Sequence, residues 1–115
     1  MNIEIPFNDW SKERLMDQSK KATSRNKKYG KVGDNFIVYK PKNHPDKYTL
    51  IAVYEIELII EIPLWFVAED LYRSEGAESK EEFVKVWEEI HPRKGYRPFD
   101  LVWYHHFKEK WKNER

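Results

Sequence analysis

The chain has 115 residues, no cysteine, only four glycines and almost no net charge. Without cysteine it forms neither a disulfide framework nor a thiolate metal site. Lysines and arginines number 21 against 20 aspartates and glutamates, which leaves a formal net charge of +1. No overall field therefore attracts nucleic acid, and any basic binding surface must be local.

Long apolar segments are missing as well. The N-terminal MNIEIPFNDW has no basic start followed by an apolar run, as a signal peptide would have. The longest apolar stretch, residues 48–62, is interrupted by three glutamates and is too short to span a bilayer. We therefore expect a cytoplasmic protein with no membrane partner.

The residues that are present suffice for one hydrophobic core. Hydrophobic residues make up 40% of the chain and aromatic residues 16%. A chain of this length has room for one domain only, because two would each be too small to bury enough surface. The sequence predicts a single domain over residues 1–115.

Alternating apolar residues predict short strands. We expect strands at 3–7 and 34–40, and another over 48–62 that is continuous or split by a bend. A closing strand is expected to carry on its inner face Phe99, Leu101, Trp103 and Phe107. Between these strands, we expect a long ordered loop at 19–31 and an exposed turn at 41–47.

Three helices are predicted from caps and periodicity. The first is expected over 10–18, with Asn8 or Asp9 as its cap. The second starts with Pro63 in its first turn and stops at Gly76, with Glu75 on its apolar stripe. The third covers 80–90 and begins with a capping box of Ser79 and Glu82; its apolar face comprises Phe83, Val86, Trp87 and Ile90.

A basic segment carries the strongest motif, Lys20-x-x-Thr23-x-Arg25. Further along, Gly33-Asp34 opens a strand, and Glu75-Gly76 precedes Ser79 and an acidic-aromatic helix. In this order the motifs resemble the ASCH family, over about residues 7–107. The resemblance implies a PUA-like fold: α+β, a small mixed β-barrel with two to three flanking helices. Strands and helices without a βαβ rhythm agree with this class.

The resemblance also implies a function. ASCH domains have a cleft suggestive of RNA binding, and small single-domain members are amidohydrolases that remove the acyl group of N4-acetylcytidine. Their catalytic lysine, threonine and glutamate fall on Lys20, Thr23 and Glu75. A modified nucleoside or RNA is the implied partner, and no cofactor is implied. The candidate substrate-binding or RNA-binding residues are Lys21, Ser24, Arg25, Lys28 and Tyr29.

The chemistry of these residue types fits amide hydrolysis. A threonine hydroxyl attacks an acyl carbon only when a base takes its proton, and a lysine can be that base only when neutral. Lowering a lysine pKa from about 10.4 towards 7.5 takes about 4 kcal/mol, to which burial and neighbouring cations contribute. Glu75 is then the acid that protonates the leaving amine, or the group that orients Lys20.

Other interpretations stay open at the level of sequence. Glu75 could be a helix-end carboxylate paired with Lys20 or Arg25. Arg25 could hold a phosphate or pyrimidine carbonyl, or fix the loop through backbone carbonyls, and the basic residues near Tyr29 could be a solvated loop. The rival functions are a non-catalytic RNA-binding module and RNA cleavage. The four histidines do not have metal-site spacing, so no metal is expected.

Overall fold

The computed structural model describes residues 1–41 and 49–113, which form one mixed sheet and three helices. The strands lie in the order β1-β3-β4-β5-β2, and β1 is parallel to β3 whereas the other neighbours are antiparallel. The strands are β1 (Asn2–Ile3), β2 (Ala22–Arg25), β3 (Asn35–Tyr39), β4 (Leu50–Pro63) and β5 (Leu101–Lys112). The helices are α1 (Asp9–Met16), α2 (Leu64–Asp70) and α3 (Lys80–Ile90). This is the predicted α+β class.

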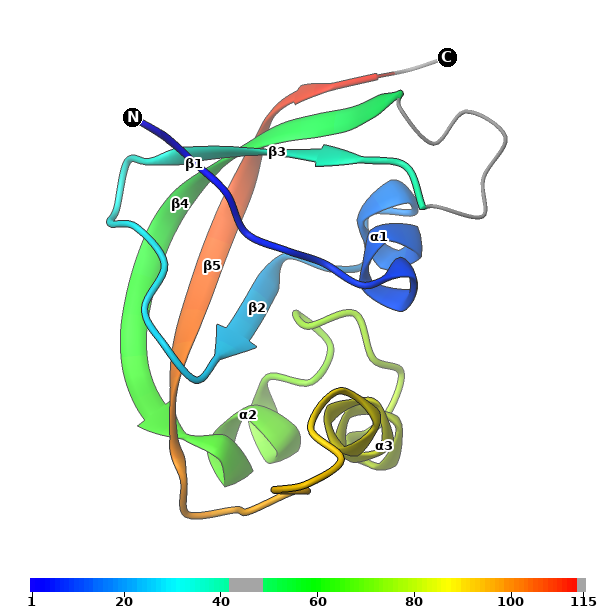
Figure 1. Ribbon diagram of the computed structural model, residues 1–115, viewed down its shortest axis with the longest axis vertical. Coiled ribbons are helices and arrows are strands. Elements are labelled where there is room, and N and C mark those ends of the chain that lie inside the picture. The colour runs from blue at the N-terminus through cyan, green and yellow to red at the C-terminus, as the bar shows by residue number, and fades with distance from the viewer. Residues whose placement is uncertain (42–48, 114–115) are drawn as a thin grey trace.

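Two hydrophobic clusters lie at opposite ends of the sheet. One packs α1 against β3 and β4 through Leu15, Phe36 and Ile56. The other packs α2 and α3 against β5 through Val67, Trp87 and Val102. Figure 1 shows the long, curved strands β4 and β5 running from one end to the other, with the short β2 between α1 and α3. The fold therefore places β2 where two helical lobes meet.

Helix α3 has the predicted bounds and cap. The Ser79 hydroxyl accepts a hydrogen bond from the Glu82 amide at 3.1 Å, and the Glu82 carboxylate in turn accepts one from the Glu78 amide at 3.0 Å. On its predicted apolar face, Phe83 and Trp87 are buried. Helix α1 begins one residue earlier than expected, after the cap Asn8, and ends at Met16.

The predicted loop at 19–31 is wrong for its central part, which forms β2. The sequence of this strand, ATSR, has no apolar alternation that would have predicted it. The strand forms because its backbone pairs with β5, and its Thr23 and Ser24 hydroxyls bond to other polar side chains. The first strand is also shorter than expected, since it comprises only Asn2 and Ile3. The turn expected at 41–47 lies, apart from Pro41, outside the described residues.

The second predicted helix is too long. Helix α2 ends at Asp70, so Glu75 belongs to a turn and not to a helical stripe. Gly76 follows with a φ of +96°, a left-handed conformation, and a Cβ there would lie 3.0 Å from the Arg14 side chain. Glu75 is nevertheless buried, because its backbone forms a bridge with Lys20.

The inner face of the closing strand was predicted correctly at Phe107 but incorrectly at its start. Phe99 and Leu101 are 85% and 55% exposed, whereas Val102, Tyr104 and Phe107 are buried. Phe99 precedes β5, in a segment whose carbonyls accept hydrogen bonds from the first amides of α2. The pairing of β4 with β5 shifts in register between Ile56 and Leu58. Near this shift the buried positions of β5 change from Val102 and Tyr104 to His105 and Phe107, which strict alternation does not predict.

None of the helices in the described part of the chain is long and apolar enough to cross a membrane.

Candidate active site

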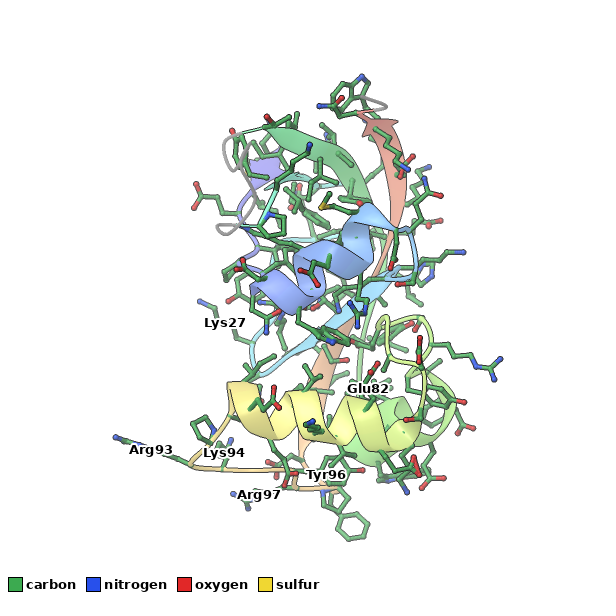
Figure 2. All side chains as sticks on the ribbon, turned by 90° about the vertical axis from the view of Figure 1, so that its right-hand side faces the viewer. Lys27, Glu82, Arg93, Lys94, Tyr96 and Arg97 are labelled. Atoms are coloured by element: carbon green, nitrogen blue, oxygen red, sulfur yellow. The ribbon has the colours of Figure 1, made fainter. Side chains whose placement is uncertain are left out.

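A cleft of about 390 Å³ lies beside β2, and its volume is within the range of small-molecule sites. Figure 2 shows α1 and α3 on the same side of the sheet, with Lys27 at the edge of the space between them. One wall is apolar and is formed by α3, with Phe83, Val86, Trp87 and Ile90. The opposite wall is polar and includes Lys20, Thr23, Ser24, Arg25 and Glu75. The cleft thus offers an apolar surface facing a charged one.

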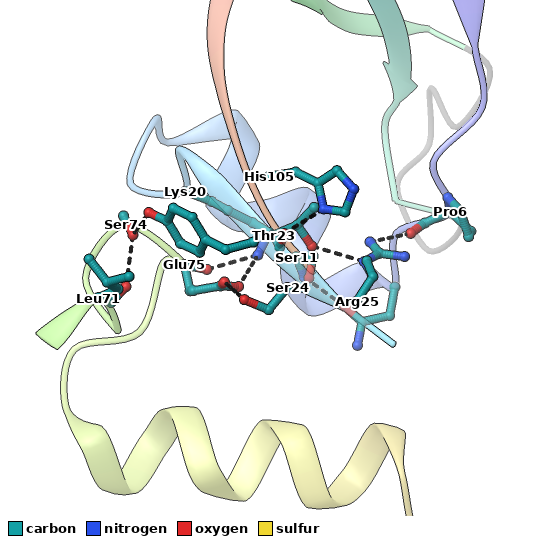
Figure 3. A network of polar contacts seen from close by, with 12 residues as sticks. Pro6, Ser11, Lys20, Thr23, Ser24, Arg25, Leu71, Ser74, Glu75 and His105 are labelled. Carbon is teal, nitrogen blue, oxygen red and sulfur yellow. Dashed lines mark hydrogen bonds and ion pairs between the residues drawn. The ribbon is translucent and has the colours of Figure 1, made fainter. Parts of the chain in front are cut away.

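Lys20 and Glu75 form a buried ion pair in this polar wall (Figure 3). Their side chains are 4% and 7% exposed. The Lys20 ammonium donates to the Glu75 backbone carbonyl at 2.9 Å and contacts carboxylate Oε1 at 3.4 Å. Burial lowers the pKa of Lys20; the Glu75 carboxylate opposes this effect, and the Arg25 charge adds to it. A lysine in this setting releases its proton more readily than one in water.

Ser24 contacts the other oxygen of the same carboxylate. Its hydroxyl donates to Glu75 Oε2 at 2.6 Å, and the residue is buried. The two carboxylate oxygens therefore have different partners, with the serine hydroxyl on one and the lysine ammonium on the other. The sequence analysis placed Ser24 among the binding residues, without this contact.

Thr23 has a different set of partners, although it lines the same cleft. Its hydroxyl accepts a hydrogen bond from Arg25 Nε at 3.0 Å. Within residues 1–41 and 49–113, no hydrogen bond joins this hydroxyl to Lys20 or Glu75. The donated N–H occupies an acceptor position of the oxygen and leaves its proton available to another group.

Arg25 connects β2 to the N-terminal segment. Its guanidinium donates to the Pro6 carbonyl at 2.6 Å and lies over the ring of Phe7, with its carbon 4.9 Å from the ring centroid. The same carbon lies 5.6 Å from the ring centroid of Tyr29. The Pro6 contact is one with a backbone carbonyl, as one of the two roles considered for Arg25 requires.

The other predicted binding residues are not all brought together. Tyr29 lines the cleft. Lys21 lines a second cavity instead, on the other side of Lys20, with Glu57 and His106. Lys28 lies over the ring of Trp103, with its ammonium 5.7 Å from the centroid.

His105 is a buried part of the site that the sequence analysis did not identify. Its Nε2 accepts a hydrogen bond from the Tyr29 amide at 2.9 Å, so Nδ1 carries the proton and donates to the Thr23 carbonyl at 3.2 Å. Burial lowers the pKa of His105, which keeps the imidazole neutral. The sequence analysis considered the histidines as metal ligands, and the described residues contain no group of three or more side chains suited to a metal ion.

Comparisons with known proteins establish the fold. No family model and no curated protein sequence matches the chain. An ASCH domain from Lactobacillus crispatus is 17% identical with a TM-score of 0.65, and the match covers 96% of this chain and 79% of that one. A DUF984 protein from Enterococcus faecalis is 18% identical with a TM-score of 0.66, covering 95% and 80%. An ASCH protein from Zymomonas mobilis is 9% identical with a TM-score of 0.66, covering 98% and 73%.

The chain therefore has the small α+β fold of these ASCH domains, as its motifs suggested. At these identities the likeness concerns the fold, and a function must be argued from the site.

Proposed function

We propose that the protein is an amidohydrolase that removes the acyl group from N4-acetylcytidine or a related N4-acylated cytosine or cytidine. The observation that carries this proposal is the buried Lys20–Glu75 pair in the polar wall of the cleft. Burying two charges costs free energy, and ionisable groups with altered proton affinity in a cleft are typical of catalytic sites. Burial lowers the pKa of Lys20 and so favours the neutral amine that a general base requires.

The proposed reaction uses three side chains in two steps. Thr23 Oγ attacks the acyl carbon while its proton passes to neutral Lys20, and the bond between that carbon and N4 breaks. The leaving N4 takes a proton from Lys20, which Glu75 orients, and the acyl group remains on Thr23 as an ester. Water then attacks the ester with Lys20 again as base, which releases the carboxylic acid and restores the threonine hydroxyl.

The shape of the cleft supports a nucleoside-sized substrate. The apolar wall of α3 suits the flat face of a pyrimidine, and Tyr29 and Trp87 supply aromatic rings at the cleft. The polar wall lies opposite, where the amide would face Thr23 and Lys20. A free nucleoside also needs no strong overall positive charge, in keeping with the net charge of +1.

The test is release of cytidine from N4-acetylcytidine by the purified protein, followed by chromatography. We expect Lys20→Ala, Thr23→Ala and Glu75→Gln each to lower kcat/KM by at least about a hundredfold, the usual contribution of a general base. Thr49→Ala is a matched control, because Thr49 is the other threonine of the chain and does not line the cleft. Its activity should stay within about twofold of the parent.

Non-catalytic RNA binding is the second candidate, and it rests on the cations and aromatic ring at the same cleft. Lys27 lines the cleft with its ammonium 5.0 Å from the ring centroid of Tyr29, an arrangement suited to phosphate contact beside a stacked base. If the parent protein releases no cytidine but binds single-stranded RNA, and Lys27→Ala weakens that binding, this second function replaces the first.

A further inference from the structure

The two contacts of the Glu75 carboxylate are unequal. Ser24 Oγ lies 2.6 Å from Oε2, whereas Lys20 Nζ lies 3.4 Å from Oε1. A close ammonium–carboxylate hydrogen bond is about 2.7–2.9 Å long, so the ion pair is looser than its burial would favour. The closer contact of Lys20 is with the backbone carbonyl of Glu75, at 2.9 Å. The shorter of the two hydrogen bonds to this carboxylate therefore comes from the serine hydroxyl.

We propose that Ser24 is a positioning residue that holds the Glu75 carboxylate back from a close ion pair with Lys20, so that Lys20 can release its proton in the reaction. This inference rests on the proposed function, in which neutral Lys20 is the base. Ser24 is well placed for it, because Lys20 and Ser24 both contact Glu75 across 51 to 55 residues of sequence. The hydroxyl restrains one oxygen and thereby sets the position of the other.

The physical effect concerns proton affinity. A tighter ion pair stabilises the protonated ammonium and would offset the effect of burial on Lys20. Shortening the 3.4 Å contact to about 2.8 Å strengthens the attraction, at an effective dielectric constant of about 20, by the equivalent of about 0.8 pH unit. By preventing this contact, Ser24 preserves part of the lowering that a general base needs.

The other charges near Lys20 are the same with or without the Ser24 hydroxyl. Arg25 on β2 disfavours the protonated lysine. On the far side of Lys20, the second cavity is lined by the charged or titratable side chains of Lys21, Tyr54, Glu57, His106, Lys108 and Glu109. None of these is removed in a Ser24 variant, so a change in Lys20 titration would report on the carboxylate.

The test is a titration of the Lys20 side chain by NMR, using the ε-CH₂ resonance that Lys20→Arg removes. We expect the pKa of Lys20 to rise by about 0.8 unit in Ser24→Ala and to return towards the parent value in Ser24→Thr, which keeps a hydroxyl. Ser74→Ala is the matched control, because the Ser74 hydroxyl makes an equally short contact of 2.6 Å, but with Tyr104 and not with the carboxylate. It should leave the titration unchanged.

Activity gives the second measurement. In Ser24→Ala, the rise of kcat with pH should move upward by the same interval, and at a fixed pH below that rise kcat should fall about sixfold. A Lys20 titration that stays unchanged or moves downward in Ser24→Ala would overturn the inference. If the parent protein has no turnover, the proposed function fails while the NMR titration still decides whether Ser24 restrains Glu75.

Discussion

Two Lys–Glu pairs in this protein differ in their surroundings more than in their chemistry. The Lys20–Glu75 pair lies in the cleft with side chains 4% and 7% exposed, whereas the Lys80–Glu69 pair joins α3 to α2 with side chains 44% and 48% exposed. Burial lowers the pKa of Lys20, whereas the hydrogen bond with Glu69 raises the pKa of Lys80. The same two residue types thus produce a candidate base in one place and an ordinary surface contact in the other.

The comparison shows why the residue types alone do not identify a site. In water, an ion pair keeps the lysine charged, because both ions stay hydrated and their attraction favours the protonated form. In the cleft, the loss of hydration is the larger effect, and the proton becomes easier to remove. The expected consequences can be measured on both pairs.

Breaking each pair should give the largest contrast in stability. Lys20→Met leaves the buried Glu75 carboxylate without its cation, so we expect the free energy of unfolding to fall by about 3–5 kcal/mol. Lys80→Met is the control and should leave the urea midpoint nearly unchanged, because its partner remains hydrated. Equal losses for the two variants would contradict the distinction between the pairs.

Replacing the buried pair by apolar residues should separate stability from function. In the triple variant Lys20→Met, Glu75→Leu, Ser24→Ala, no charge or hydroxyl is left without a partner among these three positions. We expect the free energy of unfolding to equal that of the parent or to exceed it by about 1–4 kcal/mol, as for other buried pairs exchanged for apolar groups. This triple variant should have no turnover, because it lacks both Lys20 and Glu75. A variant that is as unstable as Lys20→Met would show that the ion pair is needed for folding.

Local features of the structure were predictable from sequence, and long-range ones were not. Helix α3 was predicted correctly because its cap at Ser79 and its apolar period are both contained within its own residues. Strand β2 was missed because its stability comes from pairing with β5, about 80 residues away, and its side chains carry no apolar alternation. Strand propensity in such a segment depends on its neighbours more than on its composition.

The candidate site was anticipated by motif more than by geometry. Glu75 was expected to point inward from a helical stripe, and it is buried for another reason, a backbone bridge with Lys20 in a turn. The contact between Ser24 and Glu75 depends on that bridge, and no local sequence pattern predicts it, because the two residues are 51 positions apart. His105 was missed because its role comes from hydrogen bonds to Thr23 and Tyr29 in another part of the chain.

Acid should weaken the cleft region through His105. The unfolded chain binds a proton below about pH 6.5, but the folded state, whose histidine pKa is lowered, resists it. Stability is therefore complete above pH 6.5 and declines as pH falls from there towards the folded pKa, at no more than about 1.4 kcal/mol per pH unit. Protonation would also set Nε2 against the Tyr29 amide, two donors facing each other.

Unfolding in urea between pH 5 and 8 measures this effect. The slope should be smaller in His105→Gln than in the parent. The neighbouring His106 is the matched control, since it is partly exposed beside Glu57, and His106→Gln should retain the contribution of His105. The prediction fails if the stability of the parent and of His105→Gln declines with the same slope.

The smallest effect should come from salt at the exposed pair. Raising the ionic strength from about 0.01 to 1 M shortens the screening length from about 30 to 3 Å, which weakens attraction between hydrated charges. The Lys80–Glu69 contact should therefore lose its slight influence on the urea midpoint, so that parent and Lys80→Met converge at high salt. The stability difference between parent and Lys20→Met should persist, because buried charges are little screened. If high salt abolished both stability differences, Lys20 and Glu75 would have to be in contact with solvent. Burial would then no longer be a reason to expect a base in the cleft.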